Sequence, residues 1–226
     1  MMCRDESRRL LAVSLLVCCA AACVWAAECE PVTMECPKGG ACARQGEDGW
    51  IVLFDGSSMD CWQNARKPDA KNQWFIEDGL LTNEHHANNI GTKCVLKDFE
   101  LHLEYKIVKD GNSGVYLRGR VEVQILDSYG REQVVHADNG GIYGQFPPLV
   151  NASKPAGEWN TLEARYVGDV LTVTLNDRVV QNEQRITSVT GGALPGDVNE
   201  AGPLMLQGDH GKIWFRNIRV RPLEAK

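Results

Sequence analysis

The sequence lacks the basic stretches, nucleotide-binding motifs and catalytic triads that mark several large functional classes. Its 24 Lys and Arg residues form no run and are outnumbered by 30 Asp and Glu residues, which gives a formal net charge of −6. A nucleic-acid-binding protein normally carries a basic patch or stripe, so no nucleic-acid partner is expected. The chain also contains no P-loop, no dinucleotide-binding fingerprint and no Ser-His-Asp motif.

Helix signals are equally scarce, and long apolar runs are confined to the N-terminus. No window of about eleven residues combines a helical apolar stripe with capping residues. Arg4, Arg8 and Arg9 precede an uncharged stretch from Leu10 to Ala27 that ends in small residues. This order predicts a secretory signal peptide over residues 1–27, and therefore an exported protein that is periplasmic or extracellular.

Two alternatives for this leader would keep the protein at a membrane. The uncharged stretch of 18 residues is at the lower limit for a membrane-spanning helix, so it could serve as an uncleaved anchor. Cys23 follows three alanines, as in a bacterial lipoprotein, although the aliphatic residue expected three positions earlier is missing. A membrane partner is expected only under one of these two alternatives.

The nine cysteines do not form a regular framework, because four of them lie in the leader. The five that remain are Cys29, Cys36, Cys42, Cys61 and Cys94. No Cys-x-x-Cys pair suggests zinc. An exported chain would oxidise its cysteines, and the odd number leaves one over. Residues 28–48 carry three of the five together with Gly and Pro, and they are predicted to be a short linker.

The clearest structural signal is an unbroken alternation from Phe99 to Ile107, in which five apolar side chains alternate with four polar ones. A period of two places the apolar set on one face of a strand. Eight further segments with strand character are separated by turn residues: Trp50–Phe54, Trp74–Ile76, Gly114–Leu117, Val121–Leu126, Thr161–Val167, Val170–Leu175, Leu204–Gln207 and Ile213–Val220. This pattern predicts an all-β antiparallel sandwich or barrel, as one domain over residues 49–224.

A long stretch rich in Gly and Pro, residues 130–157, separates two of these strands. A long irregular loop inside a compact β domain is uncommon unless it has a function. The segment is therefore a candidate wall of a binding cleft.

Candidate catalytic residues lie on the strand from Arg120 to Asp127. Strand geometry directs Glu122 and Gln124 to one face, about 6.6 Å apart along the strand. Asp127 falls on the opposite face unless a bulge intervenes. Two carboxylates with an amide between them suit acid–base work on a sugar, although a solvated outer face is equally compatible with this alternation. His210, at a turn between two strands, is either catalytic or part of an ordinary turn.

Several segments carry a family resemblance, and they occur in one order along the chain. They are Trp50-Ile-Val-Leu-Phe-Asp-Gly56, Trp74-Phe-Ile-Glu-Asp-Gly-Leu80, Asp98-Phe-Glu-Leu101, Asn112-Ser-Gly-Val-Tyr-Leu-Arg118, Glu122-Val-Gln-Ile-Leu-Asp127, Gly141-Ile-Tyr-Gly-Gln145, Gly157-Glu-Trp-Asn160, Leu206-Gln-Gly-Asp-His-Gly211 and Phe215-Arg-Asn-Ile218. Together they resemble the 3-keto-disaccharide hydrolase domain family, from about Trp50 to Leu223.

The resemblance implies a jelly roll of two antiparallel sheets, like concanavalin A or laminin G domains, whose concave sheet forms a glycan groove. It also implies a small carbohydrate substrate, a glycoside oxidised to a ketone at C3 such as 3-keto-trehalose. The predicted catalytic residues are then Glu122 or His210 as the base and Asp127 as the acid. Arg118 would lie near the enolate oxygen, and the sugar contacts would be Gln124, Tyr143, Gln145 and Gln207.

Two routes of cleavage fit these residues: removal of the C2 proton with β-elimination and rehydration, or hydrolysis by two carboxylates. No cofactor is expected. A divalent cation could replace Arg118 at the enolate, but no ligand set in the sequence demands one. Cys61 and Cys94 depart from the family pattern and are a candidate disulfide pair. A non-catalytic, lectin-like carbohydrate-binding module and a structural envelope protein are the alternative functions.

Overall fold

The computed structural model describes residues 34–36 and 44–224. Within these residues the chain forms sixteen β-strands, one short 3-10 turn at Glu47–Gly49 and no α-helix. The predicted signal peptide (residues 1–27), Cys29 and Cys42 lie outside the described residues. No helix in the described part of the chain is long and apolar enough to cross a membrane.

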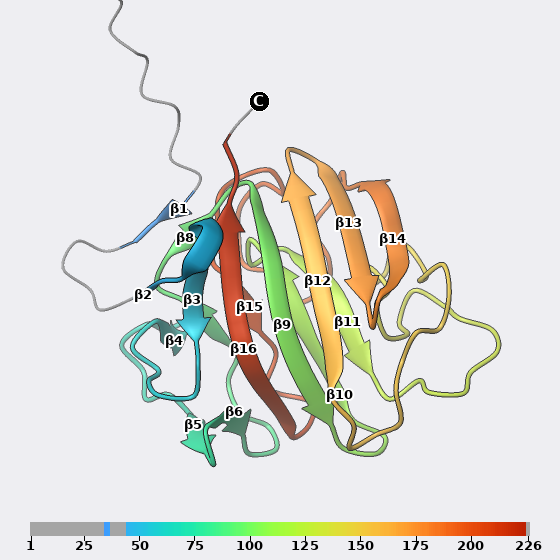
Figure 1. Cartoon of the computed structure of the whole chain (residues 1–226), viewed down its shortest axis with the longest axis horizontal. Coiled ribbons are helices and arrows are strands. Elements are labelled where there is room, and N and C mark those ends of the chain that lie inside the picture. Colours follow the sequence, from blue (N-terminus) through green and yellow to red (C-terminus); the bar gives the residue numbers. More distant parts are fainter. Residues whose placement is uncertain (1–33, 37–43, 225–226) are drawn as a thin grey trace, which may run out of the picture.

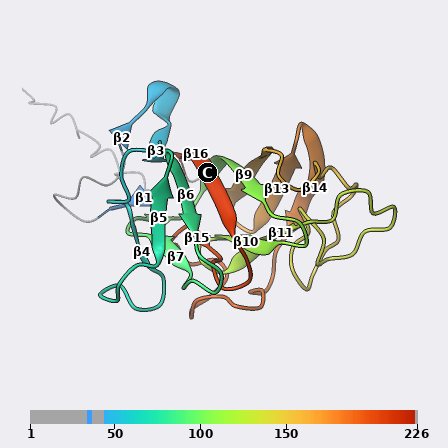
Figure 2. The same cartoon turned by 90° about the horizontal axis from the view of Figure 1, so that it is seen from below.

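The strands form two large antiparallel sheets and one small one, with the two large sheets in separate layers (Figures 1 and 2). The nine-stranded sheet has the order β14 (Arg178–Arg185), β13 (Val170–Leu175), β12 (Asn160–Val167), β9 (Phe99–Ile107), β16 (Ile213–Pro222), β3 (Ile51–Phe54) and β2 (Arg44–Gln45), with β6 (Leu80–Asn83) paired to β16 and β5 (Trp74–Glu77) paired to β6. The five-stranded sheet has the order β11 (Val121–Leu126), β10 (Asn112–Leu117), β15 (Met205–Leu206), β7 (Ile90–Thr92) and β4 (Trp62–Asn64). The small sheet pairs β1 (Met34–Glu35) with β8 (Val95–Leu96).

The core fills the space between the two large sheets. Leu101 and Leu103 of β9 are buried in one apolar cluster with Val121, Val123 and Ile125 of β11. Period-two alternation gives each sheet one apolar face, and burying both faces together removes them from water. The predicted two-sheet jelly-roll sandwich is confirmed, and so is the meander of β12, β13 and β14 around Val170–Leu175.

The sequence did not predict β14, because most of its residues are polar and only Val180 and Gln181 are buried. Its pairing with β13 also contains register shifts. The segment predicted to be a linker contributes β1 and β2, so the sheets begin before residue 49.

The long loop after β11 folds back along the edge of that strand. Gly140 N–H donates to Gln124 O (2.9 Å), Gln124 N–H donates to Gly141 O (2.9 Å) and Tyr143 N–H donates to Glu122 O (3.1 Å). These bonds cover part of the edge of β11 and fix the position of Tyr143 beside it.

A disulfide joins Cys36 to Cys94 and attaches the N-terminal segment to the sandwich. The proposed Cys61–Cys94 pair is wrong. β1 pairs with β8 so that Glu35 opposes Val95, which brings Cys36 next to Cys94. Cys61 instead faces Lys93 through the backbone, where Lys93 N–H donates to Cys61 O (2.8 Å).

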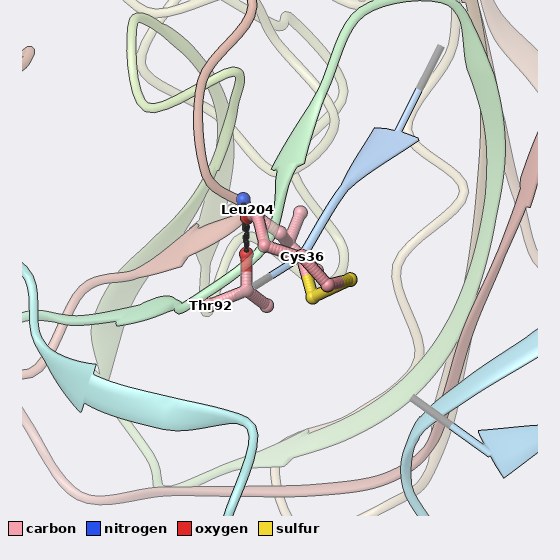
Figure 3. The surroundings of a disulfide bond; sticks show 4 residues. Cys36, Thr92 and Leu204 are labelled. Carbon is pink, nitrogen blue, oxygen red and sulfur yellow. Dashed lines mark hydrogen bonds between the residues drawn. A yellow bond between two sulfur atoms is a disulfide. The ribbon is translucent and has the colours of Figure 1, made fainter. Parts of the chain in front are cut away.

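The disulfide lies close to β15 (Figure 3). Thr92 Oγ1 donates to Cys94 O (2.7 Å) and accepts a hydrogen bond from Leu204 N–H (3.0 Å), one residue before β15 begins. This contact links the disulfide to the strand that leads to Gln207.

Replacing both cysteines (Cys36→Ser with Cys94→Ser) should lower the free energy of unfolding by about 2–4 kcal/mol, because the bridge closes a loop with a sequence separation of 58. Urea unfolding would measure the loss, and peptide mapping of the oxidised wild type should recover Cys36 linked to Cys94. A Cys61–Cys94 peptide would contradict the structure.

Candidate active site

The floor of the candidate site is the hairpin of β10 and β11, on the face of the five-stranded sheet that points away from the core. Tyr116 pairs with Glu122, and Gly114 pairs with Gln124, without a register shift. Alternation therefore directs these four residues to one face while Val121, Val123 and Ile125 enter the core.

A hollow of about 330 Å³ lies over this floor, and we call it the central hollow. Five of the predicted site residues line it: Glu122, Gln124, Tyr143, Gln207 and His210. They come from β11, the long loop and the segment after β15, so distant parts of the chain converge here.

Glu122 is almost fully buried, with 2% of its surface exposed. Its carboxylate occupies the space above Gly114, where an added Cβ would lie 2.1 Å from Glu122 Oε1. Only a glycine leaves room for the carboxylate at this position of the floor.

Burial raises the pKa of Glu122 from its ordinary value of 4.5 to about 7, because the ionised form loses its hydration. The Tyr116 side chain and the charge of His210 oppose this shift, whereas Asp209 adds to it. Burial, together with the Glu122 charge, also raises the pKa of Tyr116 well above its usual value, so Tyr116 stays a neutral hydroxyl. A carboxyl group with a pKa near 7 can give or take a proton at neutral pH.

His210 pairs with Asp209 at the edge of the central hollow. Its Nδ1 lies 2.6 Å from Asp209 Oδ1. Because Nδ1 faces a carboxylate, we assign the proton to Nδ1, which leaves Nε2 to accept or donate a proton on its other side. Gly208 allows this turn to approach the next loop closely, since an added Cβ would lie 2.7 Å from Asn88 O.

Two amide side chains present hydrogen-bond acceptors to the central hollow. Gln207 is 8% exposed, and its Oε1 has no hydrogen-bond partner within the described residues. Gln124 Nε2 donates to Asn112 Oδ1 (3.3 Å), which leaves the Gln124 oxygen as an acceptor. A buried acceptor without a partner is costly, and a ligand hydroxyl would satisfy it.

Arg118 is not part of the central hollow, contrary to its predicted place near an enolate. Its side chain is fully buried and donates to Asp98 Oδ1 (3.0 Å), Lys97 O (2.5 Å) and Gly168 O (2.9 Å). The guanidinium also lies 3.8 Å from the centre of the Tyr166 ring. Arg118 follows the end of β10 with a φ of +52°, so strand alternation does not extend to it.

Asp127 and Gln145 also lie outside the residues that line the hollow. Asp127 Oδ2 accepts a hydrogen bond from Asp110 N–H (2.9 Å), and no bulge interrupts β11 before it. Gln145 Nε2 donates to Ser188 O (2.9 Å) instead. Of the predicted carboxylate pair, only Glu122 faces the hollow.

The structure adds five lining residues that the sequence did not predict: Arg66, Asn89, Asn112, Tyr116 and Asp209. The parity of β10 could have identified Asn112 and Tyr116, since both share a face with Gly114. Arg66 and Asn89 come from loops at the far edge of the sheet and carry no local signal. Arg66 Nη2 donates to Gly192 O (2.7 Å) and Ala193 O (3.2 Å), which holds the guanidinium across the hollow's edge.

Within the described residues, no three His, Cys, Asp or Glu side chains gather in an arrangement that could hold a metal ion.

A family model described as a 3-keto-alpha-glucoside-1,2-lyase-like domain matches residues 49–221. The chain belongs to this family. The match confirms the resemblance identified from the sequence motifs, and it spans the whole sandwich that carries the central hollow.

Relatives of this 3-keto-alpha-glucoside-1,2-lyase-like chain include named hydrolases. It is 26% identical to a 3-keto-disaccharide hydrolase of Bacteroides thetaiotaomicron, over 78% of this chain and 79% of that protein. A crystal structure of a putative glycosyl hydrolase from Parabacteroides distasonis is 32% identical, with a TM-score of 0.67 over 78% of this chain and 84% of that one. A second such structure from the same organism is 21% identical, with a TM-score of 0.67 over 80% and 99% of the two chains, and it shows the shared fold.

Glu122 should lower the stability of the folded protein as the pH rises. Its folded pKa of about 7 exceeds the ordinary 4.5, so between these values the folded state keeps a proton that the unfolded chain releases. Glu122→Gln should therefore be more stable than the wild type at pH 8, by about 3 kcal/mol, and equally stable near pH 4. Urea unfolding at both pH values would measure the difference.

Glu132→Gln is the matched control, because Glu132 is exposed. Equal stability of the wild type and Glu122→Gln at pH 8 would contradict the raised pKa.

Proposed function

We propose that this protein is an enzyme that cleaves 3-keto-glycosides, such as 3-keto-trehalose, by proton abstraction at C2 followed by β-elimination and addition of water. The observation that carries the proposal is the buried Glu122, whose pKa near 7 places a base in a polar hollow opposite a histidine. The family and the named hydrolases among its relatives support the same activity.

A ketone at C3 makes this chemistry accessible to an ordinary base. The C2 proton is acidic because its removal gives an enolate on the C3 oxygen. When the enolate returns to the ketone, its electron pair forms the C1–C2 double bond and the C1–O bond breaks. The leaving oxygen takes a proton, and water then adds across C1 and C2 to give the free 3-keto sugar.

Glu122 is the proposed base. Desolvation makes its carboxylate a stronger base than an exposed one, and close to half of it is ionised at neutral pH. The pairing of Glu122 with Tyr116 across the hairpin holds it on the floor below the substrate.

His210 is the proposed acid for the leaving oxygen. Asp209 holds its Nδ1, so the outer nitrogen is available for the transfer. Glu122 and His210 together provide an acid and a base without Asp127, which lies outside the hollow. This arrangement favours elimination over hydrolysis by Glu122 and Asp127.

Arg66 takes the role predicted for Arg118, as the cation beside the developing negative charge. Gln124, Tyr143 and Gln207 would contact the sugar hydroxyls, and the unpartnered Gln207 Oε1 is the strongest of these acceptors. The proposal needs no cofactor. Export remains part of it, and the Cys36–Cys94 disulfide supports an oxidising compartment.

Incubation with 3-keto-trehalose should release glucose, plain trehalose should release none, and Glu122→Gln should reduce the rate at least about 10²-fold because the base is lost. Glucose release would be followed enzymatically beside the Glu132→Gln control. If Glu122 is the base, kcat should rise with pH around a midpoint of about 7.

Each other outcome has a defined meaning. Cleavage of both sugars would indicate direct hydrolysis, and a rate that falls as the pH rises through 7 would make Glu122 the acid. Binding of the keto sugar without turnover, unchanged in Glu122→Gln, would contradict the enzyme and favour the carbohydrate-binding module.

A further inference from the structure

A second hollow of about 330 Å³ adjoins the central one, and we call it the side hollow. The two share Arg66, Asn89 and Asp209. Asn64, Lys67 and Asn88 complete the lining of the side hollow. A glycoside with its reacting sugar over Glu122 could therefore extend past Arg66 into this second space.

The two hollows offer opposite hydrogen-bonding character. The central hollow presents acceptors, namely the Glu122 carboxylate and the side-chain oxygens of Gln207 and Gln124. These suit the hydroxyl donors of a neutral sugar ring.

The side hollow presents donors. Asn64 Oδ1 is already bonded to the N–H groups of Arg66 (3.1 Å) and Lys67 (2.9 Å), and Asn89 Oδ1 accepts from Gly208 N–H (2.9 Å). Both side chains therefore have their NH₂ groups left to donate. Within the described residues, neither these groups nor Lys67 Nζ has a hydrogen-bond partner.

The charges follow the same direction. Arg66 and Lys67 bring two cations to the side hollow against the single carboxylate of Asp209, and that carboxylate is paired with His210. Arg66 uses only Nη2 for its backbone contacts, so Nη1 and Nε remain as donors. A space lined by donors and excess positive charge is complementary to an anion.

The donors are held in place before any ligand arrives. The Asn64 side chain fixes the turn that carries Arg66 and Lys67. Gln73 and Asn88 brace the next loop through reciprocal backbone bonds, Gln73 N–H to Asn88 Oδ1 (3.2 Å) and Asn88 N–H to Gln73 Oε1 (2.8 Å). Preorganisation of this kind lowers the entropy lost on binding.

We propose that the side hollow binds the leaving unit of the substrate, and that this unit carries a carboxylate or a phosphate. The inference rests on the proposed function for the identity of the reacting sugar. It names the substrate class more narrowly: a 3-keto-glycoside whose other half is a sugar acid or a sugar phosphate. The bond that breaks would lie near Arg66 and Asp209, where the two hollows meet.

Binding of the free leaving unit tests the side hollow without any turnover. Calorimetric titration of the full chain with glucuronate, glucose 6-phosphate and glucose should show at least one anion binding about fivefold or more tightly than glucose. The preference should weaken as the salt concentration rises. The two anions distinguish a carboxylate site from a phosphate site.

Lys67→Glu should abolish this preference, and Lys71→Glu is the matched control because Lys71 is an exposed lysine on the same loop that does not line the hollow. Circular dichroism would confirm that both variants fold. Equal binding of all three ligands by the wild type, or an anion preference unchanged in Lys67→Glu, would overturn the proposal.

Turnover separates this inference from the proposed function. Methyl 3-keto-glucoside, which has no charged leaving unit, should be cleaved equally by the wild type and Lys67→Glu, whereas 3-keto-glucosyl glucuronate should show an increase in KM in the variant. Failure to cleave any keto-glycoside would refute the proposed function while the titrations still decide the side hollow. Equal effects of Lys67→Glu on both substrates would refute the inference alone.

Discussion

The strict alternation along the β10–β11 hairpin is the constraint on which the site depends. Val121, Val123 and Ile125 are held in the core, so Glu122 and Gln124 must face the other way. A slip of one residue in this pairing would place the carboxylate in the core and three apolar side chains in the hollow. The apolar side chains between the sheets therefore determine the position of the proposed base, although none of them touches the substrate space.

This position makes Glu122 costly to keep ionised. Its carboxylate lies above Gly114 with almost no exposure, and the shift of its pKa to about 7 corresponds to about 3 kcal/mol between the two protonation states. The same desolvation that weakens the fold at high pH strengthens the carboxylate as a base. Arg118 shows the contrasting solution: its buried charge is matched by Asp98 and by backbone carbonyls, so it serves the fold and has no free donor for a substrate.

Features that depend on local periodicity could be predicted from the sequence, and features that depend on long-range placement could not. The alternations at Phe99–Ile107 and Val121–Leu126 gave the fold class and the orientation of Glu122 and Gln124. Arg118 lies one residue beyond β10 at a positive φ, where parity no longer applies. The partner of Cys94 depends on the pairing of β1 with β8, across a separation of 58 residues. Arg66 and Asn89 reach the site only because β4 and β7 pair at the far edge of the sheet.

The division between strands and loops also organises the chemistry. Glu122, Gln124 and Tyr116 sit on paired strands, whose geometry the core fixes. Arg66, Lys67 and Asn89 sit on loops that leave the sheet edge, and loops tolerate change in sequence far better than paired strands do. The reacting sugar is therefore read by the rigid floor and the leaving unit by the loops. A chain with this floor could keep one reaction while changes in the Asn64–Lys67 turn alter which glycoside it accepts.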